Sequence, residues 1–145
     1  MKNSIVIIFL FVSVAPVFAQ KNITWEDLSK VTFTEKYFKK YDDYFLHPTF
    51  SESVKNLEGK RISITGYFLN LAPNGAIYIL SKGPMASCYF CGVGGPETAV
   101  ELQFPSKQPY ETDTIVTVTG VLSLNDSDVE HFNYILSDCK VTIVE

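Results

Sequence analysis

Five stretches in which apolar and polar residues alternate constrain the fold of this chain more than any other feature. They are RISITGYFLN from Arg61, AIYILS from Ala76, TAVELQF from Thr98, TIVTVTGVLSL from Thr114 and NYILSDCKVTIV from Asn133. Such alternation is typical of strands that bury one face. The first and fourth stretches are long and each carries a glycine in the middle, which permits the strong bending that a small barrel requires. We therefore predict a mainly β fold built on a small closed barrel, with an open sandwich as the alternative.

The order of these strands predicts an OB-like barrel over residues 60–145. A Pro-Asn-Gly turn at 73–75 joins the first two strands as a hairpin. The link between the third and fourth strands is too short for the helix that an OB-fold often carries there. We therefore expect the N-terminal helical segment, ahead of the barrel, to close the end of the barrel instead. Alternate residues of a strand point to the same face, which predicts the inward-facing residues of four strands. They are Ile62, Ile64, Gly66 and Phe68 in the first strand; Val100, Leu102 and Phe104 in the third; Val116, Val118, Leu122 and Leu124 in the fourth; and Ile135, Ser137, Cys139, Val141 and Ile143 in the last.

The N-terminus has the pattern of an export signal over residues 1–19. Lys2 is followed by an apolar run over 5–14, and small residues lead to a predicted cleavage site after Ala19. An uncleaved membrane anchor is the alternative, although the run is short for a bilayer and no later stretch is apolar enough to span one. We therefore expect an exported protein, periplasmic or extracellular, with no transmembrane segment in the mature chain.

Residues 20–59 predict a helical extension ahead of the barrel. Thr24 can cap a first helix in which Trp25, Leu28 and Val31 recur at helical spacing. The segment TEKYFKKYDDYF, residues 34–45, is expected to be helical or irregular and to end before the His47-Pro48 pair. A third short helix is predicted between Ser51 and Gly59.

The charge of the chain argues against nucleic acid as a partner. The sequence has 12 basic and 16 acidic residues, for a formal net charge of −4. Such a chain offers no basic surface for a phosphate backbone. The expected partner is instead an unknown envelope protein or a small ligand, and the sequence leaves the oligomeric state open. The aromatic residues clustered at 37–45 are expected to pack the extension onto the barrel. The alternative is that they form a stacking surface for sugars or single-stranded nucleic acid.

The longest predicted connection, residues 81–97, carries the sequence SCYFCGVGGP. In one interpretation, Cys88 and Cys91 form half of a zinc or copper site, because two thiolates two residues apart can bind one tetrahedral ion. The chain has no second such pair. His131 is the first choice to complete the site, and His47, Glu97 and Cys139 are further candidates. We therefore predict Cys88, Cys91 and His131 as tentative metal ligands.

Two other interpretations of the cysteine pair remain open. In an oxidising compartment, Cys88 and Cys91 can close a small disulfide that stiffens the loop. Alternatively, Cys88 is the nucleophile of a thiol–disulfide enzyme, although Gly-Val-Gly-Gly-Pro after Cys91 is a poor helix start and gives the thiolate no helix dipole. Cys139 lies on an apolar strand face and is expected to pack in the core.

Three stretches resemble a known group of proteins: LEGKRISITGYF, ILSKGPMASCYFCGVGGPETAVEL and VTVTGVLSLNDSDVEHFNYIL. They look like uncharacterised secreted proteins of Bacteroidota-type bacteria, which are similar to OB-fold-like domains of unknown function. The likeness covers nearly all of the chain after residue 19, and the cysteine loop is its most specific part. It implies an exported bacterial protein and transfers no catalytic residue. Cys139 departs from the pattern.

These observations predict an exported binding or accessory module of the cell envelope, with a Cys-x-x-Cys loop that is structural or binds metal. The alternative is a periplasmic thiol–disulfide or metal-dependent enzyme that uses Cys88 and Cys91. The sequence contains no Ser-His-Asp spacing, paired-carboxylate motif or nucleophile elbow. The acidic stretch at 125–131 is expected to be a polar loop between strands, because it lacks the spacing of a calcium loop.

Overall fold

The fold is known from a computed structural model that describes residues 20–72 and 77–144. The predicted export signal at 1–19 and the predicted turn at 73–75 lie outside the described residues. No helix in the described part of the chain is long and apolar enough to cross a membrane.

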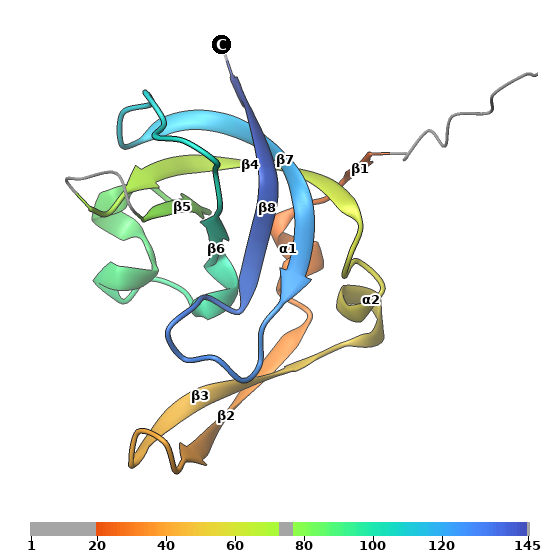
Figure 1. The fold of residues 1–145 in the computed structure, drawn as a ribbon, viewed down its shortest axis with the longest axis vertical. Helices are drawn as coiled ribbons and strands as arrows, with labels where there is room; N and C mark the ends of the chain where they lie inside the picture. The colour runs from red at the N-terminus through yellow and green to blue at the C-terminus, as the bar shows by residue number, and fades with distance from the viewer. Residues whose placement is uncertain (1–19, 73–76, 145) are drawn as a thin grey trace, which may run out of the picture.

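Five strands form the predicted closed barrel (Figure 1). They are β4 (Arg61–Asn70), β5 (Tyr78–Ser81), β6 (Ala99–Leu102), β7 (Thr114–Leu124) and β8 (Tyr134–Ile143). The strand order is β4-β5-β6-β8-β7, and β4 also pairs with β7, which closes the ring. Only the β6–β8 pair among these is parallel. This order confirms the OB-like barrel and excludes the open sandwich.

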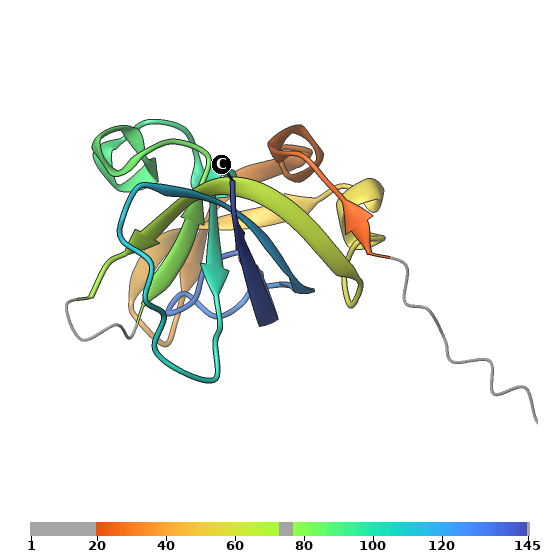
Figure 2. The same cartoon turned by 90° about the horizontal axis from the view of Figure 1, so that it is seen from above.

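Glycines in β4 and β7 let other groups approach these two strands closely. A Cβ atom at Gly66 would lie 2.6 Å from the carbonyl oxygen of Ser81 and 2.9 Å from the ring of Trp25. The Trp25 indole instead fits against this strand and donates a hydrogen bond to the Thr65 carbonyl at 2.8 Å. The long β4 and β7 arch over the other strands when the barrel is seen from above (Figure 2).

The N-terminal extension closes one end of the barrel, as expected. Strand β1 (Lys21–Asn22) pairs with β4, and two short helices follow, α1 (Trp25–Leu28) and α2 (Glu52–Lys55). Leu28 and Val54 are fully buried in the same cluster as the interior side chains of the barrel. The hydroxyl of Tyr134 on β8 donates a hydrogen bond to the Leu28 carbonyl at 2.6 Å. The extension is therefore part of one continuous core.

The prediction for residues 34–45 was wrong, because these residues belong to an antiparallel hairpin. Strand β2 (Val31–Phe38) pairs with β3 (Asp43–Phe50), and Val31 opens the first strand instead of continuing α1. Aromatic pairs meet across the hairpin on both faces: Tyr37 lies directly opposite Tyr44, and Phe38 contacts Phe45 diagonally. With aromatic residues on both faces, the sequence shows no clear period of two. In Figure 1 the hairpin projects beyond the lower end of the barrel.

The predicted inward face of the last strand was wrong before Asp138, whereas Cys139 and Val141 pack against the core as predicted. Tyr134 and Leu136, rather than Ile135 and Ser137, are buried in the barrel. The β7–β8 register shifts between Thr119 and Val121, opposite a left-handed residue, Asp138, with φ of 51°. Such a bulge exchanges the two faces of a strand. Beyond it Cys139 packs against the core, as predicted for that residue.

Candidate functional site

The longest predicted connection forms the cysteine loop, residues 82–98 between β5 and β6, and it is partly helical. It contains three short 3₁₀ helices, Met85–Ser87, Tyr89–Cys91 and Pro96–Thr98. Gly92 and Gly94 have φ values of 77° and 82°, which a residue with a side chain rarely adopts. The loop covers the outer face of the barrel, where it forms a second apolar cluster with Leu69, Ile79 and Ala99.

The two loop cysteines differ in environment. The Cys88 side chain is buried in the second cluster, and its residue is only 2% exposed. Cys91 is exposed, and its Sγ donates a hydrogen bond to the Met85 carbonyl at 3.1 Å. Both are free thiols in the structure. Cys88 directly precedes a three-residue 3₁₀ helix, which confirms that no α-helix begins at this cysteine.

His131 lies in the acidic loop, residues 125–133 between β7 and β8, where it meets a carboxylate of β6. Its Nδ1 lies 3.0 Å from both carboxylate oxygens of Glu101, and the Phe132 backbone N–H donates to the same carboxylate at 3.2 Å. The hydrogen bond and the charge of Glu101 raise the pKa of His131, with smaller contributions from Asp128 and Glu130. Glu101 therefore fixes this end of the acidic loop to the barrel.

The structure does not bring the predicted metal ligands together. Across residues 20–72 and 77–144, no group of three or more His, Cys, Asp or Glu side chains is placed to hold a metal ion. Cys139 packs against the core, and burial raises the pKa of its thiol to about 11. His47 lies on β3 opposite Thr34. The zinc or copper site of Cys88, Cys91 and His131 stays a prediction.

The structure instead brings three segments that are distant in the sequence around one groove. Its volume is about 400 Å³, and it lies between the hairpin, the acidic loop and the cysteine loop. The hairpin contributes Phe38, Tyr44, Phe45 and Leu46, the cysteine loop Tyr89 and Pro96, and the acidic loop residues 126–133. This volume is within the range of small-molecule sites.

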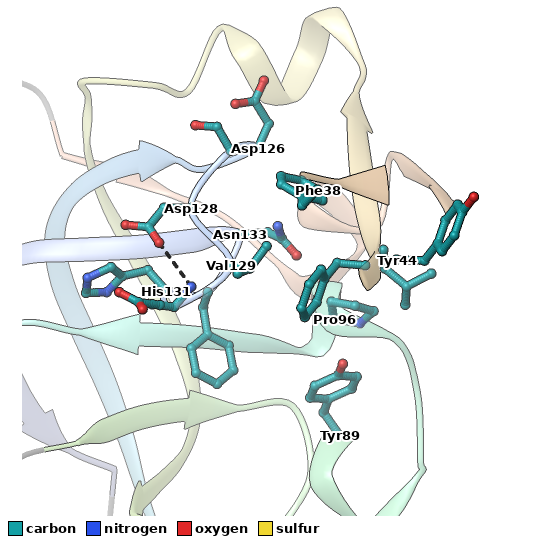
Figure 3. A pocket seen from close by; sticks show the side chains of 14 residues that line it. Phe38, Tyr44, Tyr89, Pro96, Asp126, Asp128, Val129, His131 and Asn133 are labelled. Carbon is teal, nitrogen blue, oxygen red and sulfur yellow. Dashed lines mark hydrogen bonds between the residues drawn. The ribbon is translucent and has the colours of Figure 1, made fainter. Parts of the chain in front are cut away.

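Apolar and polar side chains occupy different parts of this groove. Figure 3 shows Phe38, Val129 and Tyr89 converging on it from the three segments, whereas Asp128 and His131 point to the opposite side of the acidic loop. The Phe38 and Phe45 rings meet edge to face, with centroids 5.8 Å apart. The groove therefore has an aromatic interior with carboxylates along one rim.

Sequence reasoning identified pieces of this site without joining them. The aromatic residues at 37–45 were assigned to packing, and the acidic loop was treated as a polar connection. The long cysteine loop pointed to a functional surface, since long loops in compact domains are often functional, and the aromatic residues at 37–45 did so only in their alternative interpretation as a stacking surface. What the sequence lacked was the hairpin, because only its projection past the barrel brings Phe38 to the acidic loop.

The barrel has a counterpart among solved structures. The fold is similar to that of a DUF3299 family protein from Pseudomonas aeruginosa PAO1, with a TM-score of 0.55 and 17% sequence identity. The aligned part covers 88% of this chain and 97% of the other. At this identity the likeness concerns the fold, and it agrees with the predicted resemblance to a domain of unknown function. No protein-family model matches the sequence, and no curated protein matches it.

Proposed function

We propose that this chain is an exported binding module whose ligand or partner occupies the groove. The observation that carries the proposal is the meeting of the hairpin, the acidic loop and the cysteine loop around one cavity of about 400 Å³. In OB-folds, the face of the second and third strands and the loops after the first and fourth strands bind ligands. The acidic loop follows the fourth barrel strand, so the groove lies at one of these positions.

The cysteine loop covers the outer face of the second and third barrel strands, which leaves the groove as the open surface for binding. Ile79 and Ala99, on the outer face of the second and third barrel strands, are buried beneath that loop. The surface that OB-folds commonly offer to ligands is thus covered at this position, and the loop contributes Tyr89 and Pro96 to the groove instead. In this proposal, Cys88 has a structural role as an anchor of the loop.

The environment of the cysteines favours binding over thiol chemistry. A catalytic first cysteine is normally exposed at a helix N-terminus, where the thiolate is stabilised. Cys88 is buried and precedes only a single 3₁₀ turn. Export is part of the proposal through the apolar run at residues 5–14, and the resemblance to secreted proteins of Bacteroidota-type bacteria supports it.

An NMR titration tests the groove against several ligand classes at once. ¹⁵N-labelled mature chain is titrated with neutral trisaccharides, a lysine-rich peptide, an aspartate-rich peptide, oligothymidylate and anionic phospholipid vesicles. We expect at least one probe to give saturable shifts in residues 36–46, 87–97 and 125–133. Phe38→Ala should weaken that binding, whereas Ile115→Ala, at an exposed position of β7 that does not line the groove, should not. Failure of every probe to shift these segments would refute the proposal.

A further inference from the structure

We infer that the occupant of the groove is a neutral oligosaccharide, an inference that rests on the proposed binding function. It follows from three features of the groove: an aromatic interior, uncommitted hydrogen-bonding groups beside it, and a rim that carries charges of both signs. A pyranose ring presents an apolar C–H face and several hydroxyl groups, and these match the first two features. The third feature disfavours ligands that bind mainly through charge.

The aromatic interior supplies a surface for the apolar face of a sugar. The rings of Phe38 and Phe45 pack edge to face, and the Phe45 ring also packs against Tyr41, with ring centroids 5.7 Å apart. Rings packed in this way keep a fixed orientation. Phe38 is half-buried and points into the groove from the hairpin side (Figure 3), so one edge of the interior is rigid before any ligand arrives.

Hydrogen-bonding groups lie beside this interior. The Tyr89 hydroxyl points toward the groove in Figure 3, and no described residue forms a hydrogen bond with it. A phenol hydroxyl can both donate and accept, which suits a sugar hydroxyl. Asp126 and Ser127 line the groove from the acidic loop and add a carboxylate and a hydroxyl. Carboxylates accept strong hydrogen bonds from hydroxyl donors.

The acidic loop that carries these groups is already ordered by its own hydrogen bonds. The Asn125 amide oxygen accepts from the backbone N–H groups of Ser127 and Asp128. Its amide nitrogen donates to the Asp128 carbonyl at 2.7 Å. Glu101 holds the far end of the loop through His131 and Phe132. A loop fixed in this way loses little conformational entropy when it binds a neutral ligand.

The charges around the groove disfavour ionic ligands of either sign. Asp126, Asp128 and Glu130 stand on the acidic loop and repel phosphate groups. On the hairpin, Lys36 lies over the Phe38 ring and Lys40 over the Tyr41 ring, at 5.5 and 4.7 Å from the ring centroids. The hydrogen bond to Tyr41 raises the pKa of Lys40, which is also close enough to Glu130 and Asp128 for their charges to raise it. The positive charge of Lys40 weakens the attraction of the acidic loop for a basic ligand. A neutral, hydroxylated ligand is repelled neither by the carboxylates nor by the lysine ammonium groups.

Calorimetry and NMR with maltotriose, cellotriose and chitotriose test the inference on the mature chain. We expect at least one trisaccharide to bind saturably, with shifts in the hairpin and the acidic loop. Phe38→Ala should weaken binding by about tenfold or more, because it removes the stacking surface. Tyr89→Phe should weaken it by roughly two- to tenfold, because it removes one hydrogen bond. Ile115→Ala, at an exposed position of β7 outside the groove, is the control and should stay within about twofold of the wild type.

The outcomes separate the identity of the ligand from the existence of the site. If the lysine-rich peptide, oligothymidylate or another charged probe shifts the groove residues and no trisaccharide does, the inference is wrong and the proposed binding function stands. If no probe shifts them, both are wrong. Trisaccharide binding that Phe38→Ala leaves unchanged would place the sugar elsewhere and would also overturn the inference.

Discussion

Gly66 is the residue whose missing side chain has the clearest structural purpose. A methyl group there would overlap the Ser81 backbone carbonyl, which cannot move away as a flexible side chain could. We expect Gly66→Ala to lower the free energy of unfolding by about 1–3 kcal/mol, the usual cost of overpacking. Urea denaturation followed by tryptophan fluorescence measures this directly, since Trp25 packs against Gly66.

Gly59 provides the control for that experiment. It has a φ of 73°, and no atom lies within 4 Å of the position of an added Cβ. Asparagine accepts this left-handed conformation better than most residues. Gly59→Asn should therefore change the free energy of unfolding by less than about 1 kcal/mol. An equal loss in both variants would show that the steric argument for Gly66 is wrong.

His131 should titrate above its ordinary pKa of about 6.5, because it is hydrogen-bonded to the Glu101 carboxylate. A raised folded-state pKa gives stability that is fully present below the unfolded-state pKa and is lost as the pH rises through the folded-state value. Amide protons of residues 125–133 should therefore exchange faster, beyond the intrinsic pH effect, as His131 loses its proton. NMR titration of the His131 ring gives the pKa.

Two carboxylate variants show which charge is responsible for this shift. Glu101→Gln should return the pKa of His131 toward its ordinary value, because Glu101 is the largest contributor. Glu130→Gln removes a smaller contribution and should change the pKa less. A titration midpoint that Glu101→Gln leaves in place would contradict the assigned pair.

Cys139 illustrates what sequence periodicity can and cannot predict for a single position. Its packing against the core, like that of Val141, was predicted correctly, but Ile135 and Ser137, assigned to the same face, are not the buried residues of this strand. The cause is Asp138, whose left-handed conformation opposite Gly120 inserts a bulge. Asp138 also pairs with Arg61 on the neighbouring part of the barrel. A period-two pattern carries no information on such a register shift, because the bulge depends on contacts with another strand.

The cysteine loop is the element whose attachment can be tested most directly. In the presence of reductant, Cys88→Ser should lower the free energy of unfolding by about 1–3 kcal/mol, because it puts a hydroxyl among Leu69, Ile79 and Ala99. Cys91→Ser should stay within about 0.5 kcal/mol of the wild type, because Cys91 is exposed. Hydrogen exchange of residues 82–98 should rise in the Cys88 variant alone.

The same two variants decide between the interpretations of the pair that the sequence left open. Under oxidising conditions, a Cys88–Cys91 disulfide would make both variants less stable than the wild type, and reduction would remove this loss in Cys91→Ser while leaving the burial cost in Cys88→Ser. A metal site would instead appear as chelator-sensitive stability in the wild type that is absent from both variants and from His131→Ala. If neither effect appears, the anchoring role of Cys88 is the one that remains.

The hairpin is the element that the sequence predicted least well. Residues 34–45 combine lysines, aromatic residues and an Asp-Asp pair, with no apolar stripe at either period. What stabilises these strands is cross-strand pairing, including the Tyr37–Tyr44 contact with ring centroids 5.3 Å apart. Pairing between two strands is a tertiary property, and single-sequence patterns do not encode it. The groove depends on this hairpin, so the site could not be assembled from the sequence.

For the entire domain, the structure predicts that the extension and the barrel unfold together. Leu28 of the extension is fully buried in the core that the barrel strands share. Leu28→Ala should cost about 2–5 kcal/mol while unfolding remains a single cooperative transition. Leu46→Ala removes the same atoms from a residue that is 49% exposed and should cost less than about 0.5 kcal/mol. Two separate transitions in calorimetry would show that the extension is independent.

The barrel itself was predictable because its signals are local and repeated. Ile62, Ile64 and Phe68 on β4, and Val116, Val118 and Leu122 on β7, are all buried as the alternation predicted. Gly66 and Gly120 marked the bent strands correctly. The closure of one barrel end by the extension followed from the short link between β6 and β7. The groove has no comparable local signal, since it forms from contacts between segments up to 95 positions apart.

The hydrogen bond from the Tyr134 hydroxyl to the Leu28 carbonyl joins residues separated by 106 positions. Residue 134 must therefore leave the ribosome before the first helix can acquire its final neighbours. Chains dominated by such distant contacts fold slowly, typically in milliseconds to seconds. During that interval the newly made polypeptide remains a substrate for chaperones.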